Sequence, residues 1–104
     1  MKPRVILSPG ARRDFTAHYV WLAEHAGMAV ACRFRKAVAE TYRELAEMPA
    51  MGAPNKVRSS RYAGLRLWPV REFRNYLVAY YPRSGGISVE RLFHAKQDYT
   101  RIFE

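Results

Sequence analysis

The sequence is short of cysteine, of acidic residues and of long apolar runs. Its one cysteine, Cys32, excludes an intramolecular disulfide and fits a reducing cytoplasm. No apolar run approaches the roughly 18–20 residues that a membrane-spanning helix requires, and the apolar stretch near the N-terminus is too short for a signal peptide. We therefore expect a cytoplasmic protein that does not contact a membrane.

Basic residues outnumber acidic residues by 18 to 9, which gives a net charge of +9. So large an excess predicts an anionic partner, either nucleic acid or an acidic protein. The arginines are spread along the chain and do not form a tail, which indicates a folded domain with a basic face. With 104 residues, the chain has room for one domain, residues 1–104.

Hydrophobic periodicity predicts one strand and two helices in the first half of the chain. Residues 4–8 form a short strand that ends before Pro9. Two helices, 11–26 and 28–48, follow, and Gly27 alone joins them, so we expect an antiparallel helical hairpin. The apolar stripes of these helices are Phe15, Tyr19 (or His18), Leu22 and Ala26 in the first, and Ala31, Phe34, Val38, Thr41, Leu45 and Met48 in the second.

Residues 64–98 predict three successive antiparallel strands, which would form the platform for the helices. The first shows period-2 alternation at residues 65–68, and residues 76–81 are aromatic and aliphatic strand formers. We expect a turn at residues 82–86, because proline interrupts a ladder and paired glycines allow positive φ. In the last strand, Ile87, Val89, Arg91 and Phe93 should share one face.

The predicted order is β-α-α-β-β-β, an α+β domain with a helical hairpin packed on one face of a mainly antiparallel sheet. Residues 99–104 either pack as a last half-turn or stay exposed.

No familiar catalytic or cofactor motif is present: the sequence has no P-loop, no dinucleotide fingerprint and no nucleophile elbow. We expect Cys32 to be a small buried apolar group, and His18 and His25 to be surface or packing residues. Without a second cysteine or a carboxylate cluster we expect no metal site, and we expect no cofactor. His94 should fix the turn into the C-terminus; a general-base role is the alternative.

The densest basic stretch contains Arg58, Arg61, Arg66, Arg71 and Arg74. One interpretation is a solvated face around a sheet edge. The other is a surface that binds an anion or a protein partner.

Four motifs resemble the ParE branch of the RelE/ParE toxin superfamily. In chain order they are Met48-Pro49-x-Met51-Gly52, Gly64-Leu65-Arg66-x-x-Pro69-Val70, Asn75-Tyr76-Leu77-Val78-Ala79-Tyr80-Tyr81, and Glu90-Arg91-Leu92-Phe93-His94-Ala95-x-x-Asp98. The element order also matches the family fold along the full length. The resemblance implies a RelE/ParE-like fold and the toxin of a type II toxin–antitoxin module.

The resemblance also implies partners. A ParD-like antitoxin with a flexible acidic segment would wrap the toxin in a hetero-oligomeric complex, so DNA would be contacted only indirectly, through the antitoxin. ParE-like members inhibit DNA gyrase without chemistry of their own, so we expect a non-enzymatic gyrase inhibitor. Our candidates for binding the target are Arg58, Arg61, Arg66, Arg71, Arg74, Lys96 and Arg101, whereas the sequence identifies no antitoxin-binding residues.

The alternative is a RelE-like, ribosome-dependent mRNA endonuclease. The positions where such enzymes carry catalytic side chains align with Arg66, Trp68, Tyr76, Gln97 and Phe103. Only the first of these is cationic, so the nuclease set looks dismantled, although Lys96 and Tyr99 lie near enough to take over the roles. A simple nucleic-acid-binding module is a third interpretation, and it predicts strongly salt-dependent affinity for DNA.

Overall fold

The computed structural model describes residues 2–54, 60–97 and 99–103. Its elements are β1 (Arg4–Leu7), α1 (Pro9–His25), α2 (Met28–Glu47), the 3₁₀ turn η1 (Pro49–Met51), β2 (Ala53–Pro54), the 3₁₀ turn η2 (Ser60–Tyr62), β3 (Arg66–Pro69), β4 (Tyr76–Arg83), β5 (Gly86–His94) and α3 (Tyr99–Ile102). The α+β class and the β-α-α-β-β-β order are confirmed, with a short extra strand, β2, before the last three. No helix in the described ranges is long and apolar enough to cross a membrane.

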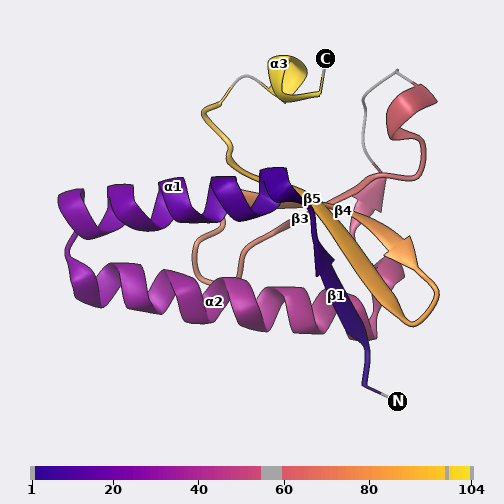
Figure 1. The fold of residues 1–104 in the computed structure, drawn as a ribbon, viewed down its shortest axis with the longest axis horizontal. Coiled ribbons are helices and arrows are strands. Elements are labelled where there is room, and N and C mark those ends of the chain that lie inside the picture. Colours follow the sequence, from indigo (N-terminus) through magenta and orange to yellow (C-terminus); the bar gives the residue numbers. More distant parts are fainter. Residues whose placement is uncertain (1, 55–59, 98, 104) are drawn as a thin grey trace.

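The five strands form one sheet in the order β1-β5-β4-β3-β2 (Figure 1). β1 pairs in parallel with β5, and the other neighbours are antiparallel. The parallel approach is close at Gly86, because a Cβ on this residue would collide with the backbone of Arg4. The N-terminal strand therefore depends on a glycine at the start of β5.

α1 and α2 form the predicted antiparallel hairpin (Figure 1). Ser8 caps α1: its Oγ accepts a hydrogen bond from the amide of Ala11 at 2.9 Å, and Pro9 occupies the first turn, where its missing N–H costs nothing. Gly27, with φ of 97°, makes the connection to α2, a backbone conformation that residues with a Cβ rarely adopt.

The main core lies between the helical hairpin and the sheet. The predicted stripe of α2 is buried there from Ala31 to Leu45 and packs with Val78, Tyr80 and Val89 of the central strands. The prediction that Met48 belongs to the buried stripe was wrong: the residue is 63% exposed, because α2 ends at Glu47 and the chain turns into η1.

The opposite face of the sheet is also covered. Tyr62, Leu65, Ala79, Phe93 and Phe103 form a second, smaller buried cluster, and Figure 1 shows η2 and α3 on the side of the sheet away from α2. The segment after residue 98 thus packs through Phe103, which is 2% exposed. The sheet is an interior layer with two covered faces.

A β-bulge changes the pattern of faces along β5. Ala79 pairs with Arg91 but Tyr80 pairs with Val89, so Glu90 is an extra residue. Val89 and Leu92 consequently both belong to the helix-side core. The prediction that residues 87, 89, 91 and 93 share one face was wrong, because one inserted residue reverses the alternation beyond it.

The predicted turn at residues 82–86 is shorter than expected. β4 continues through Pro82, which pairs with Ile87, and only Ser84 and Gly85 connect the strands. β3 covers β4 only from Leu77 to Tyr80, so at Pro82 no second neighbour requires an N–H donor.

The N-cap residue of α1 and two side chains of the helix bind the edge of β5 beyond the end of β1. The Ser8 hydroxyl donates to the Glu90 carbonyl at 2.7 Å, the Leu92 amide donates to Asp14 Oδ2 at 2.9 Å, and His18 Nε2 donates to the Leu92 carbonyl at 2.9 Å. Buried backbone groups require such partners. Helix α1 therefore substitutes for a neighbouring strand at this edge.

Candidate functional site

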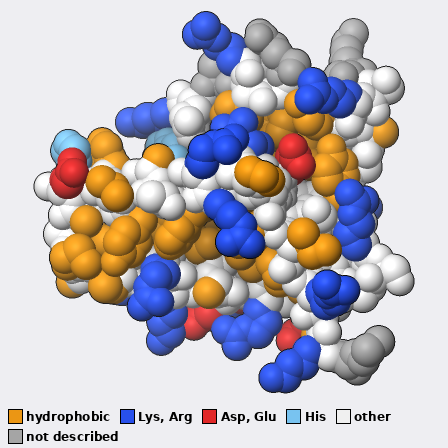
Figure 2. Space-filling model, viewed as in Figure 1, with side chains coloured by type: hydrophobic (Ala, Val, Ile, Leu, Met, Phe, Trp, Pro, Cys, Tyr) orange, Lys and Arg blue, Asp and Glu red, His pale blue; other side chains and the backbone are white. Residues whose placement is uncertain are grey.

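An apolar groove runs between α1 and α2 on the solvent side of the helical layer. It has a volume of about 350 Å³, and its apolar lining comes from the end of β1 and from both helices, namely Leu7, Ala11, Phe15, Val38, Ala39 and Tyr42. Figure 2 shows hydrophobic side chains along this layer, with Lys and Arg side chains on both sides. Phe15 and Leu7 are only half-buried, so part of the apolar lining faces solvent.

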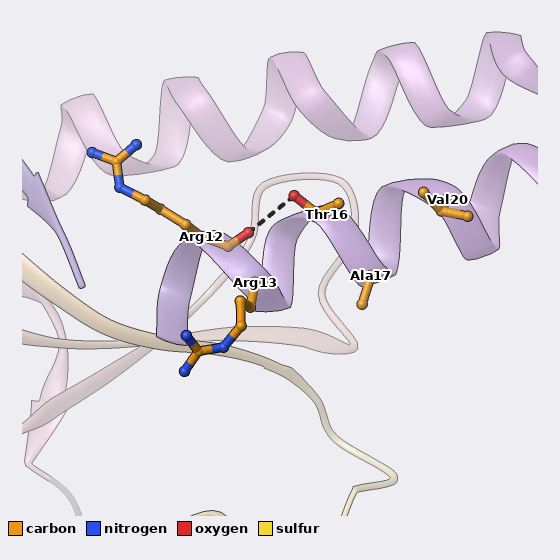
Figure 3. A pocket seen from close by; sticks show the side chains of 5 residues that line it. All are labelled: Arg12, Arg13, Thr16, Ala17 and Val20. Atoms are coloured by element: carbon orange, nitrogen blue, oxygen red, sulfur yellow. Dashed lines mark hydrogen bonds between the residues drawn. The ribbon is translucent and has the colours of Figure 1, made fainter. Parts of the chain in front are cut away.

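The groove continues along the outer surface of α1. Thr16 and Arg12 line both the groove and a shallower depression that also contains Arg13, Ala17 and Val20 (Figure 3). The Thr16 hydroxyl donates to the Arg12 carbonyl at 3.1 Å, as Figure 3 shows, so it is satisfied within its own helix. Val20 is 47% exposed. The depression therefore extends the apolar surface toward the end of α1.

Arginines border this surface on both helices. Arg12 and Arg13 belong to α1 and Arg35 to α2; all three are exposed and make no salt bridge within the described residues. Burial, with a smaller contribution from Asp14, raises the pKa of Tyr42 above its ordinary value of 10.0, so this groove hydroxyl stays neutral well above physiological pH. An apolar floor with basic rims is suited to an amphipathic segment that carries carboxylates.

The candidate arginines from the sequence do not form one patch. Arg66 donates to the Gly52 and Ala50 carbonyls, and Arg71 forms a 2.7 Å salt bridge with Glu44 of α2. Arg61 lies in η2, where its guanidinium is 5.5 Å from the centre of the Tyr62 ring. The structure thus separates these side chains and gives several of them structural partners.

The other candidates occupy two further places. Arg74 is exposed in the connection between β3 and β4, whereas Lys96 and Arg101 are exposed after β5. Arg58 lies outside the described residues. The sequence interpretation missed the groove arginines, although their signal was present: Arg12 and Arg35 stand beside the apolar stripe positions of the two predicted helices.

The Pro49-x-Met51-Gly52 motif has a clear structural cause. The fully buried hydroxyl of Tyr80 accepts a hydrogen bond from the Gly52 amide at 2.8 Å and donates to the Pro49 carbonyl at 2.7 Å. A Cβ on Gly52 would lie 2.5 Å from the Tyr80 hydroxyl and 2.8 Å from its ring. Tyr80 and Gly52 therefore fix the chain that leaves α2.

Comparisons with known proteins identify the family and a solved structure with a similar fold. The model of the family described as "ParE toxin of type II toxin-antitoxin system, parDE" matches residues 5–99. This chain belongs to the ParE toxin family. The fold is similar to a solved chain of the "Chromosomal ParDE TA system from P. aeruginosa", with a TM-score of 0.71 over 89% of this chain and 96% of that one, at 15% identity. A search of curated proteins gave no sequence match.

In this ParE-family chain, the positions aligned with the RelE-like catalytic set do not converge. Tyr76 and Gln97 line one cavity beside α1, Arg66 is bound to carbonyls at the far end of β3, and Phe103 is buried in the cluster on the opposite face of the sheet. Trp68 packs against the helix-side core. Tyr76 and Trp68 therefore lie on the helix side of the sheet, Arg66 lies at the opposite end of β3 from Pro69, and Phe103 lies on the other face.

The histidines and the cysteine have separate surroundings. His94 Nδ1 accepts a 3.0 Å hydrogen bond from the Lys96 amide, and the His94 amide donates to Gln97, which confirms that His94 fixes the turn after β5. His18 packs on β5, whereas His25 stacks on Trp21. Within the described ranges no three metal-binding side chains cluster. Cys32 is exposed, so its prediction as a buried group was wrong: it lies on the solvent side of α2.

Proposed function

We propose that this protein inhibits DNA gyrase by binding it, and that a ParD-like antitoxin neutralises it by laying an acidic amphipathic segment in the groove between α1 and α2. The observation that carries the antitoxin part is the arginine-bordered apolar groove. The family membership supports the toxin role over residues 5–99.

The groove suits a helical segment better than an extended one. It follows two antiparallel helices, and its apolar lining alternates with Arg12, Thr16 and Arg35. An amphipathic helix would cover Leu7, Phe15 and Ala39, the apolar lining that still faces solvent, while carboxylates at its margins pair with the arginines. Such a segment is disordered alone and folds as it binds, because it carries too little apolar surface to fold by itself.

The antitoxin proposal is tested by charge reversal on the groove. We expect the double variant Arg12→Glu, Arg35→Glu to weaken antitoxin binding about tenfold or more and to reduce its salt dependence. The double variant Arg74→Glu, Arg101→Glu is the matched control, because both arginines are exposed, neither lines the groove, and the change in net charge is the same. Equal loss of affinity in the control would mean that net charge, and not the groove, governs the association.

The gyrase proposal is tested by supercoiling of relaxed plasmid. Purified chain, added across a concentration series, should inhibit purified gyrase or trap cleaved DNA, and antitoxin should reverse the effect. The groove variant should still inhibit gyrase but escape the antitoxin, whereas reversal of Arg74, Lys96 and Arg101 should weaken inhibition. Absence of any inhibition at large molar excess would refute gyrase as the target.

Ribosome-dependent mRNA cleavage is the competing proposal. Lys96 supports it, because this lysine is exposed and makes no salt bridge within the described part of the chain. The proposal predicts mRNA cleavage in a translating extract that Lys96→Ala abolishes while the fold stays intact. Gyrase inhibition without RNA cleavage would exclude it.

A further inference from the structure

A second cavity lies at the opposite side of α1 from the groove. It has a volume of about 570 Å³, within the range of small-molecule sites. α1, β4, β5 and the turn after β5 contribute its lining, which is Ala17, His18, Trp21, Tyr76, His94, Lys96 and Gln97. Four of these seven side chains carry aromatic rings.

The aromatic rings are held in place by their neighbours. Tyr76 makes edge contacts with His18 and His94, with centroids 5.0 Å and 4.8 Å apart. Trp21 stacks on His25 at 4.4 Å, and the ring of His25 donates through Nδ1 to the Trp21 carbonyl at 2.9 Å. Trp21 is nevertheless 54% exposed. The cavity therefore presents a large, positioned indole to solvent.

Hydrogen bonds also fix the tautomers of the two imidazoles. His94 uses Nδ1 as an acceptor for the Lys96 amide, so neutral His94 carries its proton on Nε2 and offers a donor there. His18 donates through Nε2 to the Leu92 carbonyl. Burial, the Lys96 charge and His18 lower the pKa of His94, which keeps this ring neutral at physiological pH.

The charge of the cavity favours an anion. Lys96 contributes a positive charge to the lining of the cavity; it is exposed and makes no salt bridge within the described ranges. Among the residues that the structure describes, the lining contains no Asp or Glu. An ammonium group and an imidazole N–H are common phosphate ligands, and an exposed indole is a stacking platform for a base.

We propose that this cavity binds a mononucleotide unit, with its base against Trp21 and its phosphate at Lys96 and His94. The unit comes either from a free nucleotide or from the end of a nucleic acid strand. This site is separate from the antitoxin groove, and it requires neither gyrase binding nor cleavage.

Tryptophan fluorescence of the full chain tests the proposal. In a Trp68→Phe background, Trp21 is the single indole, so a base stacked on it quenches the signal. AMP should quench saturably at moderate salt. Adenosine should quench with about tenfold weaker affinity, and inorganic phosphate, which has no base to quench the indole, should displace AMP with about tenfold weaker affinity, because each lacks one half of the contacts. Titration with 5′-phosphorylated and 5′-hydroxyl tetranucleotides distinguishes the two sources of the nucleotide unit. If the 5′-phosphorylated tetranucleotide binds more tightly than both AMP and the 5′-hydroxyl form, the ligand is the end of a strand. Otherwise the ligand is a free nucleotide.

Matched lysine variants separate a site from the general attraction of a +9 chain for anions. Lys96→Ala should weaken AMP binding about tenfold, while Lys36→Ala, which removes an exposed lysine on α2, should leave it unchanged. The proposal is overturned if AMP does not quench Trp21, if adenosine binds as tightly as AMP, or if both lysine variants weaken AMP equally.

Discussion

Removal of the Tyr80 hydroxyl should destabilise the protein far more than its size suggests. Tyr80→Phe deletes one oxygen that is fully buried, accepts from the Gly52 amide at 2.8 Å and donates to the Pro49 carbonyl at 2.7 Å. Each lost hydrogen bond removes about 1 kcal/mol of net stability, and an amide left buried without a partner costs a further ~1 kcal/mol or more. We expect a loss of about 2–4 kcal/mol.

Urea unfolding of the variant and of a matched control measures this loss. Tyr19→Phe is the control, because Tyr19 is half-buried against the same core and its hydroxyl makes no hydrogen bond within the described residues. Removing that hydroxyl should change the free energy of unfolding by less than about 0.5 kcal/mol. If both variants lose the same stability, the hydrogen bonds of Tyr80 do not hold the chain after α2.

A double-mutant cycle with Gly52→Ala sharpens the test. The new Cβ would lie 2.5 Å from the Tyr80 hydroxyl and 2.8 Å from the ring, so Gly52→Ala should be strongly destabilising. In the Tyr80→Phe background the contact with the hydroxyl disappears and the contact with the ring remains. The loss of unfolding free energy caused by Gly52→Ala should therefore be smaller in the Tyr80→Phe background than in the native chain, but not zero. An equal loss in both backgrounds would contradict the described geometry.

Three further predictions concern α1, β1 and the turn after β5. Asp14→Ala should cost about 2–4 kcal/mol, because it leaves the Leu92 amide without its acceptor; Asp14→Asn, which keeps an acceptor oxygen, should recover part of this in urea unfolding. Gly86→Ala should cost about 1–3 kcal/mol and increase amide exchange in β1, because the methyl group meets the Arg4 backbone; unchanged exchange would refute the close approach. The pKa of His94 lies below its ordinary value of 6.5, so the folded chain binds fewer protons than the unfolded chain, and stability should fall as pH drops below about 6.5. In urea unfolding at a series of pH values, the His94→Asn variant should lose less stability below about pH 6.5 than the native chain.

Much of the fold follows from periodicity in the sequence. The stripe from Ala31 to Leu45 predicted the buried face of α2, and Gly27 predicted the hairpin, because a helix exposes one face at every three or four residues. The strand-forming run at residues 76–81 predicted the central strand β4. These elements depend on local spacing, which the sequence contains directly.

The candidate site was less predictable. The sequence drew attention to the dense arginines at residues 58–74, but Arg66 and Arg71 are bound to a carbonyl group and to Glu44 from elements at least 14 residues away. The groove arginines, Arg12 and Arg35, come from separate helices and line the same groove only because those helices pack side by side. Density along the chain does not predict proximity in space.

The sequence by itself determined the element order, the α+β class, the helix-side core and, through four motifs, the resemblance to the ParE family. Only the tertiary structure decided which residues contact one another. It shows the β-bulge at Glu90, the packing of Phe103 on the second face of the sheet, and the two cavities on either side of α1. The physical reason is the separation along the chain over which each kind of interaction acts. Periodicity and turn chemistry act between neighbours in the chain, whereas grooves, ion pairs and cavities arise from contacts between elements that only packing brings together.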